Sequence, residues 1–78
     1  MSNTAQNYLH DVIPELVTRA REARAEARKK GKADEFAAGR ALAYYEVVSY
    51  VITQLEGFGI TRDSVRVDPA FNVDRELL

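Results

Sequence analysis

Two stretches of the chain repeat apolar residues with the spacing of one helix face. In the first stretch the positions step alternately by four and three residues: Leu9, Ile13, Leu16, Ala20, Ala23 and Ala27. The second stretch follows the same alternation: Ala37, Ala41, Tyr44, Val48, Val51, Leu55 and Phe58. Such an alternation is typical of a helix that packs along one stripe against another helix. The sequence therefore predicts two long helices, at about residues 4–30 and 34–58.

The residues at the ends of these stretches are those that favour helix boundaries. Gly31 separates the two stretches, and Asp34 is of the type that caps a helix N-terminus. Gly59, followed by the apolar Ile60, predicts the end of the second helix in a Schellman-type turn. Pro14 lies inside the first helix and has no amide hydrogen to donate, so it predicts a kink or a restart there.

The two apolar stripes match each other when the chain folds back at Gly31. Ala27 then meets Ala37, and Leu16 meets Val48. Small residues gather near the turn and larger ones at the open end, so the helices can approach closely near the turn. We therefore predict an all-α fold in which residues 1–60 form an antiparallel helical hairpin.

The second predicted helix carries more apolar residues than one partner helix can cover. Its surplus residues flank the stripe on both sides, and they include three tyrosines, a residue type enriched at protein interfaces. A second copy of the chain is the simplest cover, so we predict a homodimer of the four-helix-bundle type. The architecture resembles, in shape alone, small helical hairpins that dimerise into four-helix bundles. The predicted interface residues are Tyr44, Tyr45, Val47, Tyr50 and Ile52.

Residues 61–78 have a different pattern, which predicts a short C-terminal arm. The run from Val65 to Val67 alternates like a short strand, and Asp68 followed by Pro69 favours a turn or a capped helix start. The last residues, from Arg75 to Leu78, fit a final helical turn. Several apolar residues in the arm indicate that it packs on something, either on its own chain or on a neighbour.

The chain lacks the motifs of common catalytic and metal sites. The chain has no cysteine and one histidine, so it holds neither a thiolate site nor a multi-histidine metal site. His10 and Asp11 are adjacent, and adjacent helix residues point about 100° apart, so they do not form one site. No glycine-rich phosphate loop or nucleophile motif occurs. We therefore expect no catalytic residues, no metal and no cofactor.

The charges leave a second function open. The net charge is −1, which excludes a strongly basic protein, yet seven cations gather between Arg19 and Lys32. The residues placed to contact phosphates would be Arg21, Arg24, Arg28, Lys29 and Lys30. These cations spread around the helix and no aromatic residue is interleaved with them, so a solvated helix end is the simpler interpretation. The first 33 residues are net basic and the rest net acidic, which favours self-association.

The remaining inferences concern location and function class. The N-terminus lacks the basic start and apolar core of a secretory signal, and the apolar runs are far shorter than the ~20 residues of a membrane span. We therefore expect a cytoplasmic protein with no membrane partner. The leading prediction is a small non-enzymatic interaction module, an accessory or inhibitory factor that binds another protein. The alternatives are a nucleic-acid-binding regulator and, more weakly, a small-molecule site between the helices.

Overall fold

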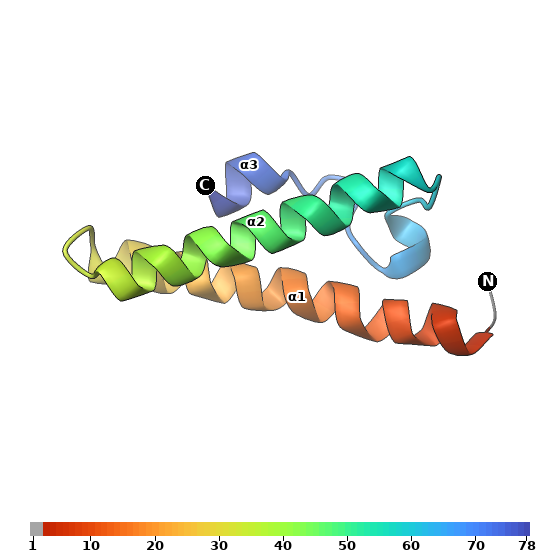
Figure 1. The fold of residues 1–78 in the computed structure, drawn as a ribbon, viewed down its shortest axis with the longest axis horizontal. Coiled ribbons are helices and arrows are strands. Elements are labelled where there is room, and N and C mark those ends of the chain that lie inside the picture. The colour runs from red at the N-terminus through yellow and green to blue at the C-terminus, as the bar shows by residue number, and fades with distance from the viewer. Residues whose placement is uncertain (1–2) are drawn as a thin grey trace.

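The fold is a long helical hairpin with a short C-terminal segment folded back along it. The computed structural model describes residues 3–78, and Figure 1 shows the arrangement. The elements are α1 (Asn3–Lys30), α2 (Glu35–Gly57), the 3₁₀ helix η1 (Asp63–Val65) and α3 (Val73–Leu77). The molecule measures 45 × 20 × 16 Å, so its length is set by the two long helices. The predicted all-helical fold with two long packed helices is confirmed.

The predicted helix boundaries correspond to particular backbone interactions. The Asp34 side chain accepts a hydrogen bond of 2.9 Å from the amide of Ala37, which caps α2. Gly59 has a φ of 71°, and the Ile60 amide donates back to the Leu55 carbonyl at 2.8 Å. Pro14 lies within α1, which continues through it as a single helix, so the expected restart does not occur.

The C-terminal segment, residues 61–78, contains no strand, so the strand expected at Val65–Val67 is wrong. Asp63–Val65 forms a 3₁₀ turn, and Arg66 follows it in the left-handed region with a φ of 62°. A lone strand would leave its backbone groups unpaired, whereas this turn bonds its amides to nearby carbonyls. The helical turn expected at the end of the chain is present as α3.

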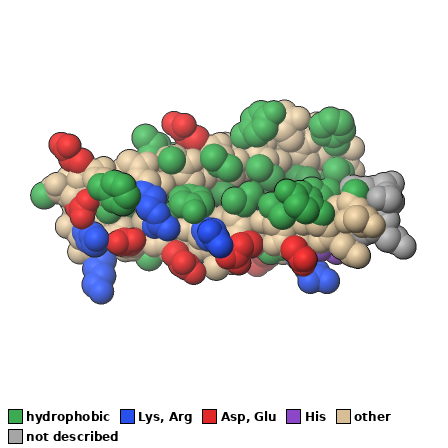
Figure 2. All heavy atoms as spheres, turned by 60° about the horizontal axis from the view of Figure 1, so that its bottom comes forward, with side chains coloured by type: hydrophobic (Ala, Val, Ile, Leu, Met, Phe, Trp, Pro, Cys, Tyr) green, Lys and Arg blue, Asp and Glu red, His purple; other side chains and the backbone are tan. Residues whose placement is uncertain are grey.

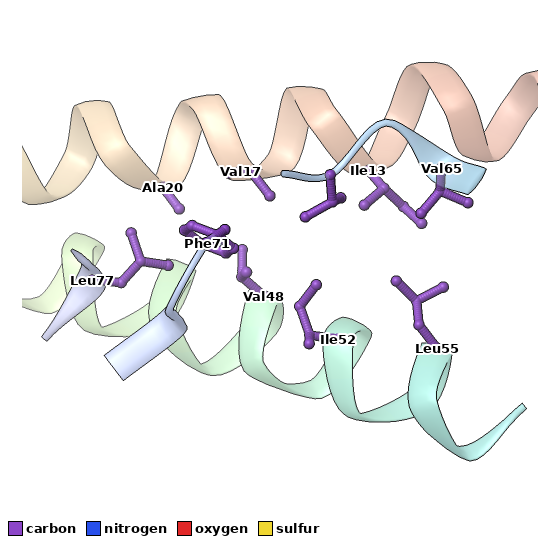
Figure 3. Close-up of a cluster of buried hydrophobic side chains, with 10 residues drawn as sticks. Ile13, Val17, Ala20, Val48, Ile52, Leu55, Val65, Phe71 and Leu77 are labelled. Carbon is purple, nitrogen blue, oxygen red and sulfur yellow. The ribbon is translucent and has the colours of Figure 1, made fainter. Parts of the chain in front are cut away.

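The core is built by three layers, not two. Ile13, Val17 and Ala20 of α1 point toward Val48, Ile52 and Leu55 of α2, and residues of the C-terminal segment pack among them (Figure 3). That segment contributes four residues that are at most 4% exposed: Val65, Val67, Phe71 and Leu77. A separate cluster near the turn consists of alanines, where α1 and α2 pack directly: Ala23, Ala27, Ala37 and Ala41.

The C-terminal segment moves the centre of the core toward one side of the hairpin. Val17 and Ile52 are 7% and 4% exposed, although the predicted stripes ran through their neighbours Leu16 and Val51. Those neighbours are half-buried and lie at the edge of the core. The hairpin therefore has one side covered by its own chain and one side left uncovered.

Candidate interaction surface

One side of the hairpin is already occupied by the C-terminal segment. Ile52, one of the predicted interface residues, packs into the core beneath it. Tyr45, another of them, is half-buried, and its hydroxyl donates a hydrogen bond of 2.7 Å to the Asp74 carboxylate. This bond, with some burial and the nearby negative charge, raises the pKa of the Tyr45 phenol. Both side chains are therefore used within the chain, and the area they offer to a partner is small.

Polar contacts from α1 hold the C-terminal segment in place. The Arg21 guanidinium lies 2.8 Å from the Glu76 carboxylate and stacks over the Phe71 ring at 4.9 Å. Arg24 donates to the carbonyl of Leu78, and His10 forms a hydrogen bond with the carbonyl of Ser64. These contacts run along one edge of α1, so the segment is attached over most of its length.

The other side of the hairpin holds a groove between α1 and α2 toward their open end. The groove encloses about 260 Å³. Its lining is apolar apart from one glutamine, and its main contributors are Leu9, Val12, Leu16, Tyr50, Val51 and Phe58. The adjacent Tyr44 and Tyr45 lie on different sides of the hairpin, because adjacent helix residues point about 100° apart. Tyr45 lies under the C-terminal segment, whereas Tyr44 lines the uncovered side beside Leu16.

Exposed apolar residues of α2 lie along the same side of the hairpin as the groove. Phe36, Val47, Tyr50 and Phe58 are 81%, 47%, 66% and 77% exposed. Figure 2 shows hydrophobic side chains gathered in a row along the long axis, interrupted by basic side chains toward its left end, with most of the acidic side chains below it. Scattered single apolar residues are normal on a protein surface, but large apolar and aromatic side chains gathered beside a groove are typical of a binding site. We call this surface the open face: Leu9, Val12, Leu16, Phe36, Tyr44, Val47, Tyr50, Val51 and Phe58.

Charged pairs form the rim of the open face. Arg19 lies 3.0 Å from the Glu15 carboxylate, and this contact together with Tyr44 raises the pKa of its guanidinium. Nearer the turn, Arg40 lies 3.4 Å from the Glu26 carboxylate and 5.3 Å from the centre of the Tyr44 ring. The rim carries both signs of charge, so an apolar partner surface can be oriented by polar contacts at its edge.

The structure divides the five predicted phosphate-contacting residues into two groups. Arg21 and Arg24 are bonded to the C-terminal segment, and Lys30 lies 3.0 Å from the Glu26 carboxylate, which raises the pKa of its ammonium group. Arg28 and Lys29 have no ion-pair partner among residues 3–78. The five residues thus do not form one open patch, because three of them already have partners.

Within the described residues, no cluster of three or more metal-ligating side chains occurs. No helix in the same range is both long and apolar enough to cross a membrane. The chain matches no protein-family model, no curated protein and no solved structure. The open face is therefore the feature of the molecule that indicates a function.

The open face contains residues that the sequence-based interface prediction omitted. Tyr44, Val47 and Tyr50 were predicted and do lie on it, whereas Leu9 and Phe58 were assigned to the seam between the helices. The signal that could have identified Phe36 and Phe58 is their spacing of eleven residues on either side of Val47. Eleven residues are close to three helical turns, so the three side chains lie on one line of α2.

Proposed function

We propose that this protein is a small non-enzymatic interaction module that acts in the cytoplasm by binding another protein through its open face. The homodimer of the four-helix-bundle type predicted from the sequence belongs to the same proposal, because a second copy would cover this face as a partner helix would. An accessory or inhibitory role follows if the bound surface is one that the partner needs for its own activity.

The observation that carries the proposal is the uncovered apolar groove with its exposed aromatic rim. The C-terminal segment covers one side of the hairpin and buries Val65, Val67 and Phe71, but leaves Tyr50 and Phe58 at 66% and 77% exposure on the other side. Exposed aromatic side chains next to an apolar groove are the anchors that dominate binding energy at protein interfaces. Their burial by a partner supplies the driving force for binding.

The alternative function, binding of nucleic acid by the basic end of α1, receives less support. Arg21 and Arg24 would have to leave the C-terminal segment before they could contact phosphates. Arg28 and Lys29 remain available, but few phosphate contacts give weak, salt-sensitive and sequence-independent binding. The apolar groove would have no role in that function.

Site-directed photo-crosslinking in the native host tests the proposal. A benzophenone amino acid replaces Tyr50 on the open face, the exposed Thr53, which lies about 120° around α2 from the Val47 line, or Arg28 at the basic end. We expect irradiation to give a nuclease-resistant protein adduct from position 50 and background levels from position 53. The adduct is then identified by mass spectrometry and reconstituted from purified components.

Two results would overturn this proposal. Adduct formation at position 50 that does not exceed the level at position 53 would show that the open face has no protein partner. A nuclease-sensitive adduct from position 28, without any protein adduct from position 50, would favour the nucleic-acid-binding alternative.

A further inference from the structure

The open face of α2 has the same pattern when it is traced in either direction from Val47. Phe36 and Phe58 lie eleven residues before and after it, and Tyr44 and Tyr50 lie three residues before and after it. The small Ala43 and the larger Val51 occupy the positions four residues away, and Arg40 and Gln54 those seven away. Every one of these positions lies within about 60° of the Val47 line, as the 3.6-residue turn requires. The aromatic residues of the stripe are therefore symmetric about Val47.

A stripe with this symmetry is complementary to a second copy of itself turned end over end. A two-fold axis at Val47 places Phe36 against the partner's Phe58, and Tyr44 against the partner's Tyr50. Small faces large where Ala43 meets the partner's Val51, which is how packed helix layers interdigitate. Such self-complementarity is what a two-fold homodimer interface requires.

We infer that the open face binds a second copy of this chain in an antiparallel, two-fold dimer centred on Val47. This inference rests on the proposed function, in which the open face is a protein-binding surface. A second copy covers that face in the free protein, and another protein would bind there in place of the second copy. The contact would run from Phe36 to Phe58 along α2, about 33 Å at 1.5 Å per residue. The two turns of the dimer lie at opposite poles, and so do the two basic ends of α1.

Charge distinguishes this arrangement from a parallel dimer. In a parallel dimer Arg40, which pairs with Glu26 at the rim, would come level with the partner's Arg40, and such like-charge contacts are unfavourable. In the antiparallel dimer it faces the partner's Gln54, whose amide oxygen accepts hydrogen bonds.

The rim of α1 has the same symmetry as α2. Val17 lies across the core from Val48, close to the level of Val47 (Figure 3). Glu15 and Arg19 lie two residues on either side of Val17 and are both exposed. At the two-fold axis, Glu15 is therefore level with the partner's Arg19, and Arg19 with the partner's Glu15. The charges of both helices thus favour the same orientation.

The available area is adequate for a small dimer. Phe36 and Phe58 are 81% and 77% exposed, and Tyr50 is 66% exposed. Aromatic side chains bury ~150–250 Å² each, so these three supply on the order of 450 Å² per copy. A standard interface buries ~800 Å² per partner, and the half-exposed Val47 and the apolar groove add to the aromatic area.

Cysteine crosslinking tests the orientation directly, because the chain has no native cysteine. Four variants are made at exposed positions: Phe36→Cys, Val47→Cys, Phe58→Cys and, as a control about 120° around α2 from Val47, Thr53→Cys. Under mild oxidation we expect Val47→Cys alone to give a disulfide-linked dimer, with yields at least tenfold above Thr53→Cys. An equimolar mixture of Phe36→Cys and Phe58→Cys should crosslink several-fold more than either variant alone.

Each opposite result overturns the inference. Crosslinking of Phe36→Cys alone that exceeds crosslinking of the mixture would show a parallel dimer, because position 36 would then face its own copy. A Val47→Cys yield no higher than that of Thr53→Cys would show that a second copy does not occupy the open face. In that case, a photo-adduct between position 50 and a different protein would leave the proposed function standing, whereas its absence would refute both.

Discussion

Replacement of Phe71 by alanine measures how firmly the C-terminal segment belongs to the fold. Phe71 is 2% exposed and lies in the core between α1 and α2 (Figure 3). Its ring supports the Arg21 guanidinium at 4.9 Å, and its carbonyl accepts a hydrogen bond from Arg62. Phe71→Ala deletes the ring and leaves a cavity at the point where all three layers meet.

The expected loss is a large fraction of the total stability. Truncation of a buried phenylalanine to alanine costs ~3–5 kcal/mol, because the transfer free energy and a cavity term add. At ~0.05–0.15 kcal/mol per residue, a chain of 78 residues has a free energy of unfolding of about 4–12 kcal/mol. Phe71→Leu keeps most of the volume and should cost less than ~1.5 kcal/mol.

Urea unfolding followed by far-ultraviolet circular dichroism gives both quantities. The three proteins must be compared at one concentration, because self-association makes the apparent stability depend on concentration. We expect a single transition for each protein and midpoints in the order wild type, Phe71→Leu, Phe71→Ala. A single transition follows because four C-terminal residues share one core with the hairpin.

Two outcomes would refute this reasoning. A change smaller than ~0.5 kcal/mol in Phe71→Ala would place it in the range of surface substitutions, so the segment would not be part of the core. A wild-type transition in two phases, with the hairpin outlasting the segment, would show that the segment docks as a separate unit.

Three further predictions concern the seam, the Tyr45 contact and the choice of partner. Val48→Asp places an unpaired carboxylate at a position that is 2% exposed and should cost several kcal/mol. Glu46→Ala, at an exposed position, should be nearly neutral in the same urea assay. Equal effects of the two substitutions would mean that the helix faces are misassigned. The raised pKa of Tyr45 means that its hydrogen bond to Asp74 stabilises the fold below the ordinary pKa of 10.0 and that this contribution is lost as pH rises through the folded-state pKa. The difference in urea midpoint between wild type and Tyr45→Phe should therefore shrink above pH ~10, and a constant difference would contradict the assigned cause. Fluorescence anisotropy should show no binding of a labelled random duplex at physiological salt, either by wild type or by Arg24→Ala with Arg28→Ala. Tyr44→Ala with Tyr50→Ala should instead weaken self-association of the protein. Tight duplex binding that the arginine changes abolish would favour nucleic acid over protein as the partner.

Local signals in the sequence were sufficient to predict the hairpin. Asp34 and Gly59 act within a few residues of themselves, through a side-chain cap and a left-handed turn, so a short window of sequence contains the information. The helix stripes are also local, since residues three and four apart share a face. The alanines near the turn predicted close approach of the helices, and they form the cluster found there.

The path of the C-terminal segment could not be predicted in the same way. Val65, Phe71 and Leu77 have no helical or strand period, and they share one core with residues of both α1 and α2. Their docking decides which half of the wide apolar arc of α2 is covered. A periodic pattern shows that both Val51 and Ile52 are near the core, but not which of them the segment will bury.

The same ambiguity affected the prediction of the interface. Tyr45 and Ile52 were grouped with Tyr44, Val47 and Tyr50 because all five flank one stripe. The structure separates them, since the first two lie under the C-terminal segment and the last three lie on the open face. The role of Arg21 could not be predicted for the same reason. Its partner Glu76 is 55 residues away in the chain, and the two side chains meet only after the C-terminal segment folds back.

Sedimentation equilibrium of the purified wild type beside Val47→Glu tests most directly whether the open face is an interface. The wild type should show about twice the chain mass of 8.8 kDa at micromolar concentration. Val47→Glu would bring two carboxylates together at the two-fold axis and should sediment as a single chain with unchanged helix content. A matched Thr53→Glu, at an exposed position about 120° around α2 from Val47, should behave as the wild type does. A wild type that stays at the mass of one chain, or a Val47→Glu variant that associates as strongly as the wild type, would contradict the dimer.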